Sequence, residues 1–252
     1  LTCDNRQVSS RALVKPPLPK GRLLILLGAM VALLSGLDAA LLRLGLKAPV
    51  TSMDLASLHG VLMIFGFLGA AITLERAVAL QSDRRRISLW AYLSPVAAVA
   101  GTALALTQIA LHGAEATRLL PALAWSASMA LLVGIYVVVW RKQPMIAVLI
   151  QALGAVAGLA GILLWGRGFE IAQIVPWWCA FLIFTIIGER LELARITFAR
   201  GSTEARVLGE VILTCVGLVM TLFAPALGYP LLGLAPVIIP AIARRDLPYN
   251  RA

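Results

Sequence analysis

Long apolar runs separated by short polar connections make up most of the chain. A helix needs about 20 apolar residues to cross the hydrocarbon core of a bilayer. Eight runs reach or approach this length, at residues 23–44, 54–80, 88–111, 119–140, 144–165, 171–198, 207–224 and 226–243. Short connections make sequence neighbours pack as antiparallel pairs. The pattern predicts an all-α polytopic transmembrane bundle of about eight helices over residues 23–243, between a basic leader at 1–22 and a tail at 244–252.

Composition agrees with this prediction. Only 13% of the 252 residues are charged and 60% are hydrophobic, whereas about 25% of the residues in a soluble domain are charged. No stretch outside the apolar runs is long enough for a large soluble domain. We therefore expect the lipid bilayer to be the main partner of the chain.

The net charge of +10 follows from topology rather than from nucleic-acid binding. If the N-terminus lies inside, 18 of the 22 Lys and Arg residues fall in inside segments. Cytoplasmic loops carry such an excess of positive charge. The bias predicts a multi-pass protein of a bacterial inner membrane, with both termini in the cytoplasm and no nucleic-acid partner.

Tryptophans fall near the ends of the predicted spans. Trp90 and Trp140 lie at inner ends, and Trp165, Trp177 and Trp178 lie at outer ends. Indole rings are enriched in the headgroup layer of membranes. We therefore expect these rings at the two membrane surfaces.

Candidate chemistry concentrates in the run 54–80, which carries His59 near its outer end and Glu75–Arg76 near its inner end. Sixteen residues separate His59 from Glu75, or about 24 Å along a helix at 1.5 Å per residue. Ionisable residues inside a membrane are costly and mark functional sites by default. The spacing indicates two separate sites, on opposite sides of the membrane.

At the outer site, His59 has two candidate neighbours. Asp38 lies at a similar depth in the preceding span, and Met63 shares the face of His59 because it is four residues further on. A carboxylate can orient a metal-binding imidazole, and imidazole with thioether suits Cu(I). His59 is thus a candidate ligand of a b-type haem or of copper, with Asp38 and Met63 as supporting residues. Alternatively, Asp38 and His59 only satisfy each other, and His112 is an exposed loop residue rather than a second axial ligand.

The inner site contains two Glu-Arg motifs, Glu75–Arg76 and Glu189–Arg190. Glu192 follows Glu189 by three residues, about one helical turn. Opposite charges near a membrane surface can neutralise each other across helices. One interpretation is a salt bridge that locks the second predicted helix to the sixth. The other interpretation is a proton or anion relay on the cytoplasmic side.

The segments "ITLERAVAL" (72–80) and "IIGERLELA" (186–194) lie 114 residues apart and share Ile, Glu and Arg. Four helices per unit would give two units of the same orientation. This spacing predicts a parallel 4+4 repeat, as occurs in some transporters.

The run "LHGVLMIFGFLGAAITLERAVAL" carries a family resemblance. It resembles the second transmembrane helix of haem-copper oxidases and nitric oxide reductases, in which a His just below the outer surface ligates low-spin haem. It is also similar to the histidine-bearing helix of the NnrS family of haem- and copper-containing proteins, and to bacterial membrane proteins with the "LERAVAL" signature. The resemblance implies an axial haem ligand at His59 only, because no predicted span after the second contains a histidine.

Three functions follow from these patterns. The first is a haem- or copper-binding membrane protein that acts in electron transfer or in the response to nitric oxide. The second is a non-catalytic subunit or assembly factor of a respiratory complex, within a larger assembly or a homo-oligomer. The third is a small transporter with Glu75 and Glu189 as coupling residues. The motifs of ordinary soluble catalysis are missing from the sequence, so an enzyme is not the expected class.

Overall fold

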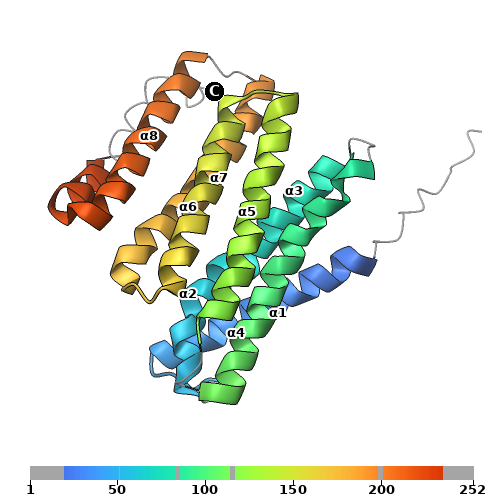
Figure 1. Ribbon diagram of the computed structural model, residues 1–252, viewed down its shortest axis with the longest axis vertical. Coiled ribbons are helices and arrows are strands. Elements are labelled where there is room, and N and C mark those ends of the chain that lie inside the picture. Colours follow the sequence, from blue (N-terminus) through green and yellow to red (C-terminus); the bar gives the residue numbers. More distant parts are fainter. Residues whose placement is uncertain (1–19, 51, 83–85, 114–116, 198–200, 235–252) are drawn as a thin grey trace, which may run out of the picture.

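The computed structural model describes residues 20–50, 52–82, 86–113, 117–197 and 201–234, and the regular structure in these ranges is helical. The helices are α1 (Lys20–Arg43), α2 (His59–Val61), α3 (Ala70–Ser82), α4 (Leu93–His112), α5 (Leu119–Lys142), α6 (Ile146–Gly166), α7 (Ile171–Thr197) and α8 (Gly201–Phe223) (Figure 1). The predicted all-α bundle is confirmed. The leader before residue 20 and the tail 244–252 lie outside the described residues.

Seven helical segments among the described residues are long and apolar enough to cross a membrane. They are Lys20–Arg43, Asp54–Gln81, Leu89–His112, Leu119–Lys142, Ile146–Gly166, Ile171–Leu193 and Ala205–Phe223. The ends of these segments lie within five residues of the ends of the first seven predicted spans. The chain is therefore built as a multi-pass membrane protein.

The eighth predicted span, 226–243, is described only in part. Residues 225–234 are helical and fold back onto α8. The backbone of Gly228 lies so close to that of Thr221 that a side chain at Gly228 would clash with it. The remainder of this span lies outside the described residues.

The second span is not one uniform α-helix. It begins with the 3-10 helix η1 (Met53–Leu58), passes through α2, widens into the π-helix η2 (Leu62–Gly69) and ends in α3. A π-helix inserts extra residues per turn and shifts the direction of every side chain after it; such segments are frequent at functional sites. The widened turns carry Phe65 into the bundle interior, where its side chain is fully buried.

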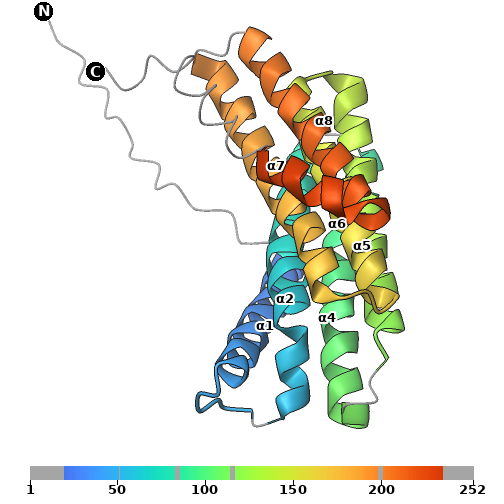
Figure 2. The same ribbon diagram turned by 90° about the vertical axis from the view of Figure 1, so that its left-hand side faces the viewer.

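The helices pack mainly with their neighbours in sequence. α6 lies between α5 and α7, α4 packs against α5, and α1 packs against η1 and η2 (Figure 1). α8 lies at the edge of the bundle, beside α6 and α7 (Figure 2). The centre of the bundle is thus formed by the second span with α5, α6 and α7.

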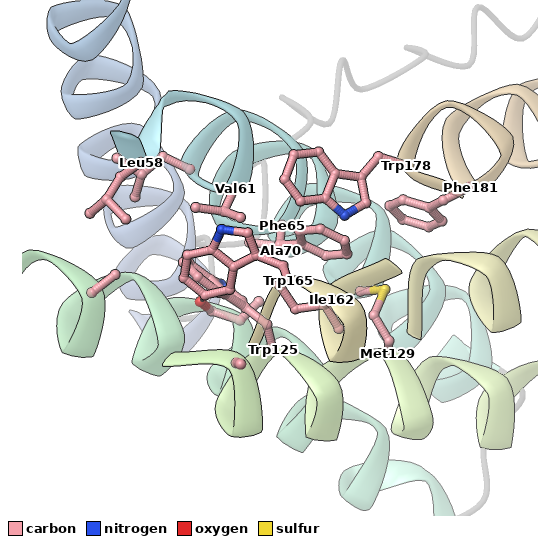
Figure 3. Packing of buried hydrophobic residues seen from close by; sticks show 14 of the residues in the cluster. Leu58, Val61, Phe65, Ala70, Trp125, Met129, Ile162, Trp165, Trp178 and Phe181 are labelled. Carbon is pink, nitrogen blue, oxygen red and sulfur yellow. The ribbon is translucent and has the colours of Figure 1, made fainter. Parts of the chain in front are cut away.

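Five aromatic side chains fill this centre. Phe65 stacks on Phe181 with ring centroids 6.1 Å apart and meets the edge of Trp178 at 5.8 Å. Trp125 and Trp165 pack edge to face at 5.9 Å on the other side of Phe65 (Figure 3). We call these five residues the aromatic layer.

Glycines make room for the indole rings of the layer. A Cβ atom at Gly161 would lie 2.7 Å from Trp178, and one at Gly60 would lie 2.8 Å from the same ring. Trp178 is therefore held between two helix backbones. A Cβ at Gly101 would lie 2.7 Å from Trp125.

Trp165, Trp177 and Trp178, which we expected in the headgroup layer, face the interior of the bundle rather than its outer surface. Their exposed fractions are 2%, 8% and 3%. Trp177 and Trp178 turn into the bundle at glycines of adjacent helices, Gly161 for both residues and Gly60 for Trp178.

We predict that Gly161→Ala destabilises the protein by about 1–3 kcal/mol, the usual cost of overpacking a filled core. The added methyl group would push Trp178 out of its place between α6 and the second span. Gly209→Ala is the matched control, because no atom lies within 4 Å of a Cβ at that position of α8. Thermal unfolding in detergent should show a lower midpoint for Gly161→Ala and an equal or higher midpoint for the control. Equal loss in both variants would contradict this packing role.

Candidate functional site

Arg76 is the centre of a polar cluster at the end of the bundle where α3, α5 and α7 terminate and α6 begins. Its Nη2 lies 3.0 Å from Oε1 of Glu189, and its Nη1 lies 3.4 Å from Oε2 of Glu192. The Arg76 side chain is 14% exposed, whereas the two glutamates are 34% and 39% exposed. The guanidinium therefore joins α3 to α7 from the buried side of the pair.

Gln151 extends the cluster onto α6. Its Nε2 donates a hydrogen bond of 3.3 Å to Oε2 of Glu192, and the residue is fully buried. The side chain can lie here because α7 has Gly188 at the contact, where a side chain would clash with Gln151. The close α6–α7 approach thus positions the amide beside the ion pair.

Tyr136 brings α5 into the same site. Its ring lies under the guanidinium, with the Arg76 Cζ atom 5.9 Å from the ring centroid, and only 1% of the residue is exposed. A cation over an aromatic face is attracted by the ring quadrupole. Tyr136 lies six residues before Lys142 at the end of α5, about 9 Å along the helix axis. The cluster is therefore below the surface of the bundle.

A cavity of about 210 Å³ opens beside this cluster. Exposed residues Lys142 and Gln143 line its mouth, while the buried residues Tyr136 and Gln151 line its floor. Arg76 and Glu192 also border it, with Ala79, Leu80, Val139 and Val148 as the apolar part of the wall. This volume is below the range of roughly 300–1,000 Å³ found for pockets that hold drug-sized ligands. The cavity suits a small solute.

Three buried polar atoms at this cavity have no hydrogen-bond partner among the described residues. They are Nε of Arg76, the hydroxyl of Tyr136 and Oε1 of Gln151. Buried polar groups are nearly always hydrogen-bonded, and each exception needs an explanation. The three atoms belong to residues that line one cavity, whereas the other unpartnered buried atoms of the described residues lie elsewhere in the bundle.

Only one residue of each Glu-Arg motif belongs to the polar cluster. Arg76 and Glu189 take part in the cross-helix ion pair, together with Glu192, as the salt-bridge interpretation expects. Glu75 and Arg190 are exposed and lie outside the cluster. Each motif therefore contributes one of its two charged residues to the ion pair.

His59 lies far from this cluster, at the other end of the second span. Its Nδ1 lies 2.8 Å from the carbonyl oxygen of Gly36 on α1. A carbonyl oxygen only accepts hydrogen bonds, so Nδ1 carries a proton, and in the neutral form of the ring Nε2 has the lone pair. Metal-binding histidines are often held in this way by a backbone carbonyl.

The other predicted outer residues are arranged differently from expectation. Asp38 is buried and accepts a hydrogen bond of 3.1 Å from the backbone N–H of Val50, so Gly36 rather than Asp38 orients the His59 ring. The Met63 sulfur packs against Gly36, 2.7 Å from the position of a Cβ there. His59 and Met63 therefore meet at the same glycine, while His112 is exposed at the last residue of α4.

Two further observations bear on the choice of site. Within the described ranges, no group of three or more His, Cys, Asp or Glu side chains is arranged to hold a metal ion. A second polar cavity, of about 280 Å³, lies at the His112 end between η1, α4 and α5, where Arg118 covers the ring of Trp165 at 5.6 Å. The lining residues of that cavity have no unpartnered buried polar atom of the kind found at the Arg76 cavity.

Comparison with known protein families assigns the chain to one family. The family model described as "Domain of unknown function (DUF8744)" matches residues 22–235. The chain belongs to this family. Comparison with the curated proteins gives no match, and comparison with the solved structures gives none either. The geometry of the site is therefore the basis for a function of this DUF8744 member.

Sequence reasoning did not single out Tyr136 and Gln151. Both are isolated polar residues inside apolar runs, "GIYVVVW" and "VLIQALG". Polar side chains inside spans usually face the bundle interior, so this signal could have found them. Their convergence on Arg76 depends on how α3, α5 and α6 are rotated, which the sequence pattern leaves open.

We predict that Arg76→Gln destabilises the protein by about 1–3 kcal/mol, because two carboxylates then lose the cation that satisfies them. The cost stays below that of a fully buried pair because the glutamates are partly exposed. Arg190→Gln removes the same charge from an exposed position, and its effect should stay within about 0.5 kcal/mol. Chemical or thermal unfolding of both variants in detergent tests this, and equal stability of the two would contradict a structural role for the ion pair.

Proposed function

We propose that the protein is a small transporter that binds a polar solute in the Arg76 cavity. The observation that carries the proposal is that Arg76, Tyr136 and Gln151, each with a buried polar atom that has no partner among the described residues, line one cavity inside the membrane-spanning bundle. In apolar surroundings such atoms are costly, so their retention favours a bound ligand.

The charge of the cluster supports a coupling role. Arg76, Glu189 and Glu192 hold each other through contacts that join α3 to α7. A solute that competes for the guanidinium would weaken the link between these helices. Binding and helix movement are coupled in this way, as a carrier requires.

The charge bias of the chain indicates the side of the membrane on which the cavity opens. The positive-inside rule supports a cytoplasmic position for the end that carries Lys142 and Gln143, because 18 of the 22 basic residues fall on that side in the proposed topology. The mouth of the cavity then faces the cytoplasm.

Uptake into proteoliposomes tests the transporter proposal. The panel contains radiolabelled L-lactate, L-alanine, glucose, choline and spermidine. We expect at least one solute to enter faster with the wild-type protein than with Tyr136→Phe or Arg76→Gln. Glu75→Gln is the matched control, since it neutralises an exposed carboxylate next to Arg76, and its flux should stay at the wild-type rate. Identical flux through all proteins for every solute would contradict the proposal.

A second candidate function is supported by the His59 ring. The bond from Nδ1 to Gly36 leaves the Nε2 lone pair as a ligand atom, and the Met63 thioether lies at the same glycine. Imidazole and thioether together suit Cu(I). Trp178 fills the space against Gly60 next to His59, so these residues fit a copper ion better than the broad ring of a haem. Either group would supply one-electron chemistry or nitric-oxide binding, as the NnrS resemblance implies.

A visible spectrum with metal analysis of the purified protein tests this second function. Copper at about one ion per chain, lost in His59→Ala and kept in His112→Ala, is the expected result. A Soret band that is lost in His59→Ala would instead identify haem as the bound group. Metal-free, colourless protein from copper- and haem-supplemented cells would contradict both.

A further inference from the structure

The buried positions of the second span recur every four residues, whereas an α-helix has 3.6 residues per turn. They fall in pairs at 61–62, 65–66, 69–70 and 73–74, followed by Ala77. Sixteen residues of uniform α-helix would turn through four full turns and about 160° more. Val61 and Ala77 would then lie on nearly opposite sides of the helix, yet their exposed fractions are 1% and 0%.

The π-helix η2 keeps this buried stripe on one side of the span. η2 and α3 pack against the same three helices, α1, α4 and α5. A backbone bond in a π-helix spans five residues instead of four, so each turn takes in one more residue. At Gly69, the position of a Cβ lies 3.2 Å from the carbonyl oxygen of Ile64, five residues earlier. The widened turns thus take up about one residue, or about 100° of the rotation.

Thr73 supports the junction at which the π-helix ends. Irregular turns free backbone groups, and inside a membrane Ser and Thr side chains satisfy such groups. The hydroxyl of Thr73 is fully buried and donates to the carbonyl oxygen of Gly69 at 2.7 Å, with that of Ala70 at 3.1 Å. This bond stabilises the change from η2 to α3 at its present place in the chain.

The extra residue decides which charge of the Glu75–Arg76 motif faces α7. Without it, each residue of α3 would take the place now held by the next residue. Glu75 would then lie where Arg76 lies, against the carboxylates of Glu189 and Glu192. Arg76 would take the place of Ala77, which is fully buried in an apolar cluster. Repulsion between like charges and burial of an unpaired cation both oppose that arrangement.

We propose that η2 is a register device of the second span, equivalent to one inserted residue. Its widened turns rotate α3 so that Arg76 rather than Glu75 meets α7. The His59 half of the span keeps its own face toward α1, where the ring bonds to Gly36. Removal of one residue from η2 gives a uniform α-helix in which both halves keep their present places.

Single-residue deletions in the full-length protein test this proposal. Phe67 and Leu68 are partly exposed residues of η2, and deletion of either should leave a folded protein. Deletion of Val156, which is 46% exposed in the uniform helix α6, is the matched control. It would move Ile162 into the place of Gly161, against the Trp178 ring, and should abolish folding. Monodisperse elution in detergent and a cooperative thermal transition measure folding.

Arg76→Gln reports the rotation of α3 in the deletion variants. In the otherwise unchanged protein this substitution removes the ion pair with Glu189 and should lower the unfolding midpoint by a few degrees. We expect the same shift after deletion of Leu68, because Arg76 keeps its place. Glu75→Gln changes an exposed residue and should leave the midpoint unchanged in both backgrounds.

Two results would overturn the register proposal. One is loss of folded protein in both η2 deletions to the same extent as in the Val156 deletion, since the π-helix would then not hold a removable residue. The other is a folded Leu68 deletion in which Arg76→Gln no longer lowers the midpoint, because α3 would then have rotated by one residue.

Discussion

Close packing of indole rings against glycine backbones holds the centre of this bundle together. Lipid is as apolar as the side chains it surrounds, so helices in a membrane associate through van der Waals packing and interhelical hydrogen bonds rather than through the hydrophobic effect. Trp178 contributes to that packing on two sides, since it fills the gaps left by Gly60 and Gly161. One indole ring of α7 therefore fills the space between α6 and the second span, with its pyrrole edge at Gly161 and its benzene edge at Gly60.

The candidate site depends on the same packing. α7 carries Phe181 in the aromatic layer and Glu189 in the polar cluster, about 12 Å apart along the helix axis at 1.5 Å per residue. The glycine contacts of α6 with α7 continue to Gly188, where Gln151 takes the place that a side chain would need. A shift between these two helices would move Gln151 and Glu192 out of hydrogen-bond distance. The aromatic layer thus holds the helices that position the polar cluster, without itself taking part in the cluster.

The sequence predicted the parts of this fold that the bilayer dictates. Apolar length sets the spans, so seven of them could be located from the pattern alone. The burial of Trp178 could not be predicted in this way, because it depends on Gly60, a residue of a helix far along the chain. The π-helix at 62–69 was also missed, because its apolar sequence fits an α-helix equally well. Its extra residues change which face of α3 meets the interior.

The two Glu-Arg motifs show why the site could be predicted only in part. Successive residues of a helix point about 100° apart, so each motif can turn only one of its charged residues inward. A favourable pair needs opposite charges, which Arg76 provides from α3 and Glu189 from α7, while Glu75 and Arg190 remain exposed. The sequence alone is equally compatible with the reverse choice, Glu75 with Arg190. Because Arg76 is the inward residue, the cluster has one cation between two carboxylates, and this cluster lies at the wall of the cavity.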